Sequence, residues 1–370
     1  MNYKLLLLYC LLILMSCNET RKQPNIINEI PDIKIESLEL DSIYCDSIDA
    51  SYVGSLHWYN DTLFYVDEKF CTVFAFNSNG ALVNRFLNQG SGPNEVATTS
   101  IVGYCHLKDG GHLFLGPSND CYIFNQELEK INFFVISRQS AIFDISYDSP
   151  YCYTLSYPNL LLRNHNDMIY SNVYCEHPQL HMLKSYDRYV ENAHFLASIK
   201  MNGGLMDKVL GNYPLIYKNE NTKQFSLVNY DIDEGGNFYV SFEADSLIYF
   251  YNDKFEPLYS FGYEGKDMDK NYSNLRSLRD FRNRQMEERE KYSYYTWIEY
   301  IDERKVLFRS YKKQFISDVD GLQIYQNSIL IGDVNVPKGF KVIGYSMPYF
   351  YGVVPIDEDN EIIKFYRFKI

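Results

Sequence analysis

One pattern of three short apolar runs, separated by tight turns, recurs along this chain and constrains its fold more than any other feature. It is clearest over 235–262, where 237–242, 246–251 and 256–261 read as three strands. The turn between the last two is Asn252-Asp253-Lys254, whose side chains can cap nearby backbone groups. The same cadence recurs at 61–87 and 109–136. Repetition of this kind predicts an architecture built from small antiparallel sheets.

The composition also favours strands. The chain has 370 residues, 46% hydrophobic and 22% charged, as in an ordinary globular protein. Its 35 Tyr and 24 Phe, against 2 Trp, pack well on pleated surfaces and indicate an all-β chain. The Tyr excess fits rings packed with their hydroxyls at a wet edge, or a surface on which sugars stack. The net charge of −13, without a basic stripe, argues against a nucleic-acid partner.

The N-terminus has the pattern of an export signal. Lys4 precedes an apolar run over 5–15, which is too short to cross a bilayer as a helix and suits a signal peptide. The tetrapeptide Leu-Met-Ser-Cys at 14–17 then resembles a bacterial lipobox. The resemblance implies cleavage after residue 16 and acylation of Cys17. The acyl chains would anchor the protein in a membrane, which is thus an expected partner. We therefore expect a lipoprotein signal peptide over 1–16, lipid attachment at Cys17 and a polar tether over 17–31. The alternative is an ordinary secretory signal with an incidental cysteine.

Six further cysteines remain in the exported chain. Exported proteins often pair cysteines as disulfides, and the sequence alone cannot assign the pairing. Cysteines are also small buried hydrophobic residues, and a core of this size needs no covalent staple. Both interpretations stay open for Cys45, Cys71, Cys105, Cys121, Cys152 and Cys175.

The repeat can be counted in units of about four strands. Such units fit 52–87, 101–136, 224–261 and 294–334, and a three-strand unit fits 341–368. A poorly defined third unit lies between 141 and 212, with strands expected at 151–156 and 168–174 and an ambiguous, partly helical stretch at 180–201. The alternating stretch 33–40 predicts a half-buried strand that can complete the last unit.

These elements predict an all-β chain, a single six-bladed β-propeller domain over 32–370 closed by the N-terminal strand. A closed ring leaves few exposed strand edges. The chain without its signal, tether and insertion supplies about 51 residues per blade, near the ~50 of the larger propeller repeats. Five or seven blades stay open as alternatives, because the third unit is poorly defined.

One helical insertion is predicted near 266–292. Its helix should span 273–291 and be capped by Ser273, with favourable i,i+4 charge pairs. The expected pairs are Asp280 with Arg284 and Glu287 with Lys291. The arginines Arg276, Arg279, Arg282 and Arg284 could dock a partner or lipid headgroups, although a solvated helix face explains them as well.

The glycine-rich loop at 89–96 does not match a phosphate-binding loop, because no Gly-Lys-Ser/Thr follows it. It connects one blade to the next. The run Asn84-Arg85-Phe86 followed by Gly90-x-Gly92-Pro93-x-Glu95, with 300–309 and 363–368, resembles the TolB-like six-bladed propeller lipoproteins of Bacteroidota. The resemblance covers most of the mature chain and implies the fold and lineage. It carries over no catalytic residue, and Asn94 stands where that group usually has Gly.

No motif predicts catalysis, a metal site or a cofactor. The turns at 233–237, 267–271 and 318–321 lack parts of a calcium loop and are typical of hairpins. Cys175 and His177 with His181 are the best metal candidates, but Pro178 argues against the helix that would align the two histidines. No Gly-x-Ser-x-Gly elbow occurs, and the many carboxylates single out no pair.

Two functions are compatible with these features. The first is a non-catalytic cell-envelope lipoprotein that binds a protein or a glycan at one propeller face, with 266–292 as a rim element. The second is a propeller enzyme, a glycan lyase or hydrolase, with its site in the central channel. The fold cannot decide between them. We expect anchoring in the outer membrane, and the sequence leaves the periplasmic and the surface-exposed side equally open.

Overall fold

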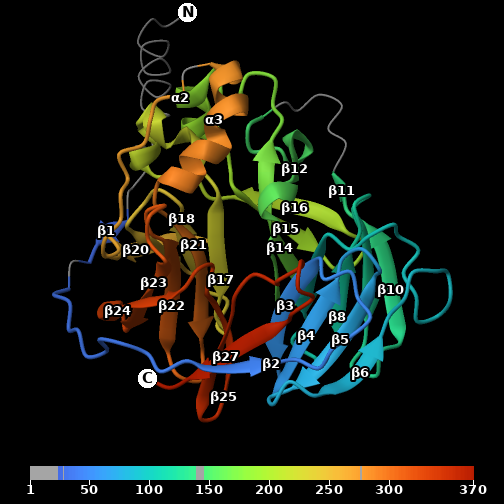
Figure 1. Ribbon diagram of the computed structural model, residues 1–370. Helices are drawn as coiled ribbons and strands as arrows, with labels where there is room; N and C mark the ends of the chain where they lie inside the picture. Colours follow the sequence, from blue (N-terminus) through green and yellow to red (C-terminus); the bar gives the residue numbers. More distant parts are fainter. Residues whose placement is uncertain (1–23, 28, 139–145, 276) are drawn as a thin grey trace, which may run out of the picture.

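The computed structural model describes residues 24–27, 29–138, 146–275 and 277–370. They form six sheets arranged as the blades of a ring (Figure 1). The innermost strands of neighbouring blades contact one another, and the stacked rings of Trp58 and Tyr351 join the first blade to the last. The predicted all-β, six-bladed propeller is confirmed.

Blades 1, 2 and 5 each have four antiparallel strands that follow the chain from the centre of the ring outward. Blade 1 consists of β3 (Gly54–Tyr59), β4 (Thr62–Asp67), β5 (Thr72–Asn77) and β6 (Leu82–Phe86). Blade 2 consists of β7 (Gly103–His106), β8 (His112–Leu115), β9 (Asp120–Phe124) and β10 (Lys130–Val135). Blade 5 consists of β21 (Tyr294–Ile301), β22 (Val306–Lys312), β23 (Val319–Gln326) and β24 (Ile329–Pro337). The middle strands are buried on both faces because each blade packs between two neighbours.

Blades 3 and 4 carry additional short strands. Blade 3 consists of β13 (Leu162–His165), β14 (Met168–Cys175), β15 (Leu196–Lys200) and β16 (Leu205–Leu210), with β12 (Tyr153–Leu155) on β14 and β11 (Ser137–Arg138) on β16. Blade 4 consists of β17 (Val228–Ile232), β18 (Phe238–Phe242), β19 (Ile248–Tyr251) and β20 (Pro257–Phe261), with β1 (Asn25–Ile26) parallel to β20. Short 3₁₀ helices connect these elements: η1 (Pro150–Cys152), η2 (Tyr157–Asn159), η3 (Leu215–Lys218) and η4 (Glu220–Phe225).

An N-terminal strand closes the ring, as predicted, but not the predicted segment. Blade 6 consists of β25 (Lys341–Ser346), β26 (Tyr349–Val353), β27 (Lys364–Phe368) and β2 (Asp41–Tyr44), so the closing strand begins after 33–40. The apolar alternation at 33–40 reflects packing, because Ile35, Leu38 and Leu40 lie against the core between blades 5 and 6. Their backbone passes from one blade to the other; Lys34 N and Ile35 N donate to Ile331 O of β24, and Ile35 forms an isolated bridge with Gly332, but no strand forms over 33–40.

The predicted tether over 17–31 is also shorter than expected. Asn25 and Ile26 pair with β20 of blade 4, and Ile27 N donates to Ser260 O at 2.7 Å. The N-terminal segment thus follows the outer edges of blades 4, 5 and 6 in turn before it reaches blade 1 (Figure 1). Residues 1–23, with the predicted signal peptide and Cys17, lie outside the described residues.

The poorly defined third unit is a blade. The strands predicted at 151–156 and 168–174 are present as β12 and β14, whereas β13 and β16 were not predicted. The ambiguous stretch 180–201 contains the short helix α2 (Tyr186–Asn192) and then β15. Helix and strand share this stretch because Tyr186, Tyr189 and Val190 on α2 are buried over the same core that β15 enters.

The predicted insertion contains α3 (Leu278–Lys291), which begins later than predicted. Ser277 caps it by accepting a hydrogen bond from Asp280 N at 3.0 Å. Ser273 is not the cap, because Tyr272 and Leu275 are buried in the extended segment around it. The helix forms an ion pair between Arg284 and Glu288 rather than either pair expected. Figure 1 shows α2 and α3 together on one face of the ring.

The six cysteines in the described residues form no disulfide with one another, and five of them are buried, as small hydrophobic residues are. No helix in the described part of the chain combines the length and apolar character that a membrane-spanning helix needs.

Candidate functional site in the central channel

The centre of the ring contains a cavity of about 490 Å³, within the usual range for small-ligand sites. It is lined by the innermost strands β3, β7, β13, β21 and β25 and by loops at the ends where those strands begin. The insertion 266–292, which we expected at the rim of a binding face, contributes no residue to the lining.

Each of the six innermost strands places one ionisable side chain at this centre. Five of these side chains line the cavity, and the sixth, Asp231, lies 2.8 Å from Arg163. The set consists of His57 on β3, His106 on β7, Arg163 on β13, Asp231 on β17, Glu299 on β21 and Lys341 on β25.

Arg163 holds the two acids. Its Nη2 donates to Glu299 Oε2 at 2.7 Å, and its Nε lies 2.8 Å from Asp231 Oδ1, close enough for an ion pair but not aligned as a hydrogen bond. Asp231 Oδ2 also accepts from Tyr300 N at 2.7 Å. Burial raises the pKa of both carboxyls, and that of Glu299 reaches about 8 although Arg163 opposes the shift. One guanidinium therefore serves two acids, and Glu299 carries a proton at neutral pH.

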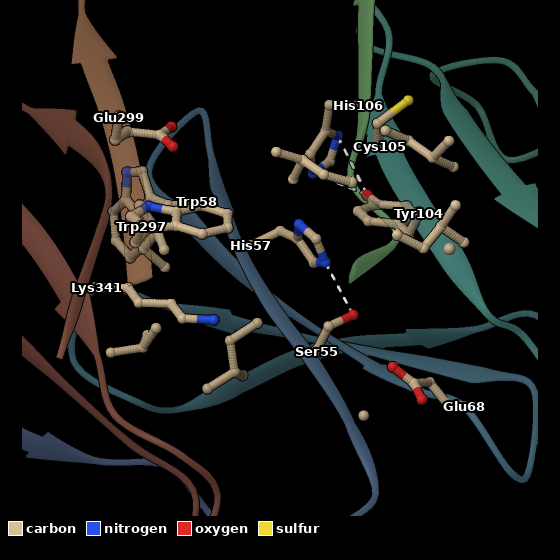
Figure 2. Close-up of a pocket in the computed structure, with 18 of the residues that line it drawn as sticks. Ser55, His57, Trp58, Glu68, Tyr104, Cys105, His106, Trp297, Glu299 and Lys341 are labelled. Carbon is tan, nitrogen blue, oxygen red and sulfur yellow. Dashed lines mark hydrogen bonds between the residues drawn. The ribbon is translucent and has the colours of Figure 1, made fainter. Parts of the chain in front are cut away.

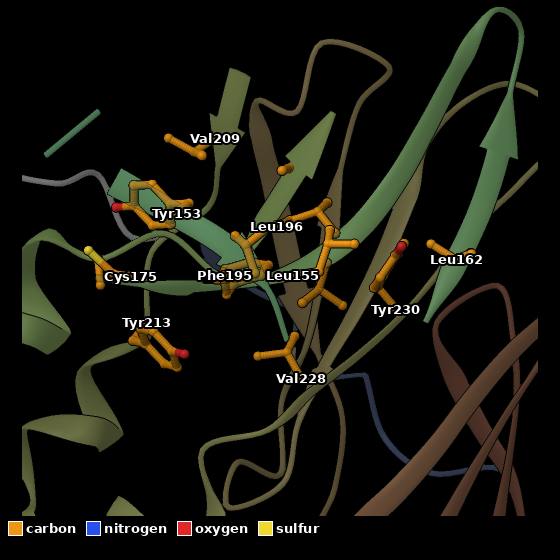
Figure 3. Close-up of a cluster of buried hydrophobic side chains, with 14 of the residues drawn as sticks. Tyr153, Leu155, Leu162, Cys175, Phe195, Leu196, Val209, Tyr213, Val228 and Tyr230 are labelled. Atoms are coloured by element: carbon orange, nitrogen blue, oxygen red, sulfur yellow. The ribbon is translucent and has the colours of Figure 1, made fainter. Parts of the chain in front are cut away.

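The histidines on the other side of the cavity are neutral. Burial lowers the pKa of His57 to about 3, and the positive charges of Arg163 and Lys341 add to the shift. His57 Nε2 lies 2.9 Å from Ser55 Oγ (Figure 2). Burial and the neighbouring histidines also lower the pKa of His106, which shares the Tyr104 hydroxyl with His112. With its pKa lowered this far, His57 is a poor proton acceptor at neutral pH.

Lys341 is the cation in this set without an acidic partner among the described residues. Its ammonium lies 4.9 Å from the centre of the Trp297 ring, and burial alone lowers its pKa, with no carboxylate close enough to raise it. In Figure 2 the Lys341 and Glu299 side chains and the His57 ring extend into the same space.

Both tryptophans of the chain line the cavity, but each already has a partner over its ring. Trp58 stacks on Tyr351 with ring centres 3.5 Å apart, and Trp297 has Arg163 and Lys341 over its ring. Tyr59 stacks on His106 at 4.5 Å. The cavity therefore does not match the sugar-stacking surface that the aromatic composition left open.

The other sequence candidates do not come together here. His177 Nδ1 and His181 Nδ1 each accept a backbone N–H two residues ahead, and in the described residues no group of three or more His, Cys, Asp or Glu side chains could hold a metal ion. Asp233 closes its hairpin by accepting from Asn237 N at 2.8 Å, as a plain turn does. In the 89–96 loop, Glu95 accepts from Gly92 N at 2.7 Å, which folds the loop onto itself.

Sequence reasoning missed all six ionisable side chains at the centre. The one signal that could have found them is an ionisable residue within a predicted innermost strand: Lys341 is the first residue of the strand expected at 341–345, and Glu299 lies within the one expected at 294–300. Arg163 gave no such signal, because no strand was predicted around it.

Two solved structures with a similar fold come from Bacteroides. A member of the DUF4221 family from Bacteroides vulgatus aligns with a TM-score of 0.67 and 13% identity, covering 90% of this chain and 98% of that one. A candidate exported protein from Bacteroides fragilis aligns with a TM-score of 0.53 and 14% identity, covering 93% and 99%. At these identities the likeness shows the fold alone. No protein-family model matches the sequence, and a search of curated proteins finds no significant relative.

Proposed function

We propose that this chain is a TolB-like lipoprotein of the cell envelope that binds a small ligand in its central cavity without chemically changing it. The observation that carries the proposal is the cavity itself, which five of the six innermost strands line with an ionisable side chain, while Asp231 from the sixth pairs with Arg163. Export and anchoring through Cys17 in the outer membrane rest on the N-terminal sequence. The similar fold of the candidate exported protein from Bacteroides fragilis supports an envelope location.

Catalysis is the second candidate, because Glu299 is a buried acid whose pKa is raised to about 8, as in a general acid. Three features favour binding instead. Glycoside hydrolysis commonly needs two carboxyl groups at the scissile bond, and here Asp231 is not part of the lining, while Glu68 lies across the cavity from Glu299 (Figure 2). Glu299 is itself held by Arg163, and His57 is too weak a base for proton abstraction near neutral pH. Turnover of a polysaccharide that is lost in Glu299→Gln would instead establish the enzyme.

The two tryptophans provide a direct test of cavity binding. Trp58 and Trp297 are the only tryptophans in the sequence and both line the cavity, so 5-fluorotryptophan gives two ¹⁹F signals that report on this site. Titration with neutral and acidic oligosaccharides and short peptides should shift one or both signals. A ligand that raises the melting temperature while leaving both signals unchanged would show that binding occurs elsewhere.

A bulky substitution supplies the control. Ser55→Trp adds volume inside the cavity and should abolish the shifts of the two native signals. Ser78→Trp places the same ring in the turn between β5 and β6 and should leave them intact. The anchor is tested separately by labelling with a radioactive fatty acid, which Cys17→Ser should abolish.

A further inference from the structure

We infer that the ligand of the central cavity is a small organic anion whose carboxylate binds between Lys341 and His57. This inference rests on the proposed function and names the chemical class of the ligand. It depends on how charge is distributed over the cavity walls.

Lys341 is the first part of the argument. A buried ammonium is costly unless an anion or hydrogen-bond acceptors compensate it. Lys341 has only the Trp297 ring as a partner among the described residues. Cation–π contact is worth much less than a close ion pair in a partly desolvated site. The side chain therefore extends into the cavity with its hydrogen-bonding capacity largely unused.

The surroundings of His57 show where the positive potential lies. Two cations, Arg163 and Lys341, both act on its ring, and no carboxylate counteracts them. An imidazole on which two positive charges act lies in a region of positive potential, and an anion is stabilised there. His57 is held at 2.9 Å from Ser55 Oγ, so its orientation is set before a ligand arrives.

The acids of the site lie elsewhere. Glu299 and Asp231 are both held by Arg163, and Glu299 keeps its proton at neutral pH. Glu68 lies in the lining below Ser55, and burial raises its pKa as well (Figure 2). The cavity thus has one uncompensated positive charge, at Lys341, and its carboxyls do not neutralise it.

Size and the occupied aromatic faces limit the ligand further. About 490 Å³ accommodates a molecule of roughly one or two sugar rings, not a folded chain. Because Trp58, Trp297 and Tyr59 already stack on other groups, recognition here depends on charge and hydrogen bonds. An acidic sugar and a simple dicarboxylic acid share this chemistry.

The test compares charged and uncharged forms of one molecule. D-glucuronate is titrated against its methyl ester, which differs by the loss of the charge, and against succinate, which carries carboxylates without a sugar ring. Binding is followed by the two ¹⁹F-tryptophan signals. D-glucuronate should bind at least tenfold more tightly than its ester, and comparison with succinate then shows whether the sugar ring contributes.

Variants at one position locate the carboxylate. Lys341→Met keeps the aliphatic stem and should weaken D-glucuronate binding at least tenfold, while Lys341→Arg should restore most of it. Lys254→Met removes an exposed charge from the turn between β19 and β20 and should change nothing. The melting temperature of each variant confirms that it is folded.

The outcomes separate the two proposals. If the ester and glucuronate shift the tryptophan signals equally, or Lys341→Met binds glucuronate as wild type does, the anion inference is wrong and cavity binding stands. If none of these probes and no neutral oligosaccharide or peptide moves either signal, both proposals are refuted.

Discussion

Replacing Arg163 with Met should destabilise the protein by about 3 to 5 kcal/mol, the usual cost of removing one partner of a buried ion pair. Arg163 has 20% of its side chain exposed, against 8% for Asp231 and 15% for Glu299, so water screens these contacts weakly. The charge pair of Arg163 with Asp231 at 2.8 Å has a Coulomb energy of roughly 6 kcal/mol at an effective dielectric constant of about 20, and the contact with Glu299 at 2.7 Å adds a hydrogen bond. Desolvation offsets part of this, and the variant leaves two carboxyls without a cation.

The loss of stability caused by Arg163→Met should increase with pH. The pKa of Glu299 is raised from 4.5 to about 8 in the fold, so its contribution to stability is complete below about 4.5 and is lost as the pH rises through about 8. Without Arg163 both carboxyl pKa values rise further. The difference between Arg163→Met and wild type should therefore be smallest near pH 5, where Glu299 is protonated, and largest near pH 9.

Urea unfolding of purified protein at pH 5, 7 and 9 measures this directly. Glu299→Gln is the informative companion, because it leaves Arg163 and Asp231 as a single pair and should cost about 1 kcal/mol or less. Arg188→Met, on the exposed face of α2, controls for loss of charge. A deficit below about 1 kcal/mol for Arg163→Met, or one that does not change with pH, would contradict the assignment of the two acids to this guanidinium.

Four further results are expected. Binding of D-glucuronate should weaken from pH 6.5 to pH 9 in wild type, but less in Glu299→Gln. Glu299, which faces Arg163 and Asp231, ionises as the pH passes about 8 and then adds a negative charge to the cavity. Arg289→Met should cost about 1 to 3 kcal/mol and speed amide exchange in 278–291, since Arg289 Nη1 donates to the buried Glu243 at 2.9 Å. Reducing agent should leave the melting temperature unchanged because the six cysteines form no disulfide with one another, and the five buried thiols should react with a thiol reagent mainly after unfolding. Ile43→Pro should open the ring and lower the melting temperature far more than Ser42→Pro. Cys45 N donates to Ile363 O, and alternate N–H groups along a strand point to the same side, so the Ile43 N–H also points toward β27 and proline removes it.

The sequence predicted the ring well because a blade is a local structure. Turns such as the one ending at Gly80, whose φ is 84°, are encoded by a few adjacent residues, and strand alternation needs no distant partner. Prediction failed where the chain pairs with a distant blade. The stretch 33–40 alternates like a strand because it packs against two blades, and the hydrogen-bonded segment follows it.

The site was beyond sequence reasoning for the same reason. Arg163, Asp231 and Glu299 are separated by at least 68 residues along the chain, and only the order of the blades brings them within ion-pair distance. No local motif records that three innermost strands meet at one point. Each residue alone is indistinguishable from a charge on a strand edge, which is why the sequence favoured no carboxylate.

The position of the anion site within the ring links its binding to the closure of the fold. Lys341 comes from the last blade and His57 from the first, and these blades share a core in which Trp58 packs on Tyr351 and Phe365. Blade 6 is complete only when β2 pairs with β27, and the chain after β2 is fixed to blade 1 where Asp46 N donates to Gly80 O at 2.8 Å. A ligand held by both Lys341 and His57 would therefore bind the closed ring more tightly than an opened one. By thermodynamic linkage, the ligand must then stabilise the closed ring by the same factor by which closure raises its affinity. Pairing of β2 with β27 and ligand binding therefore favour each other where the first and last blades meet.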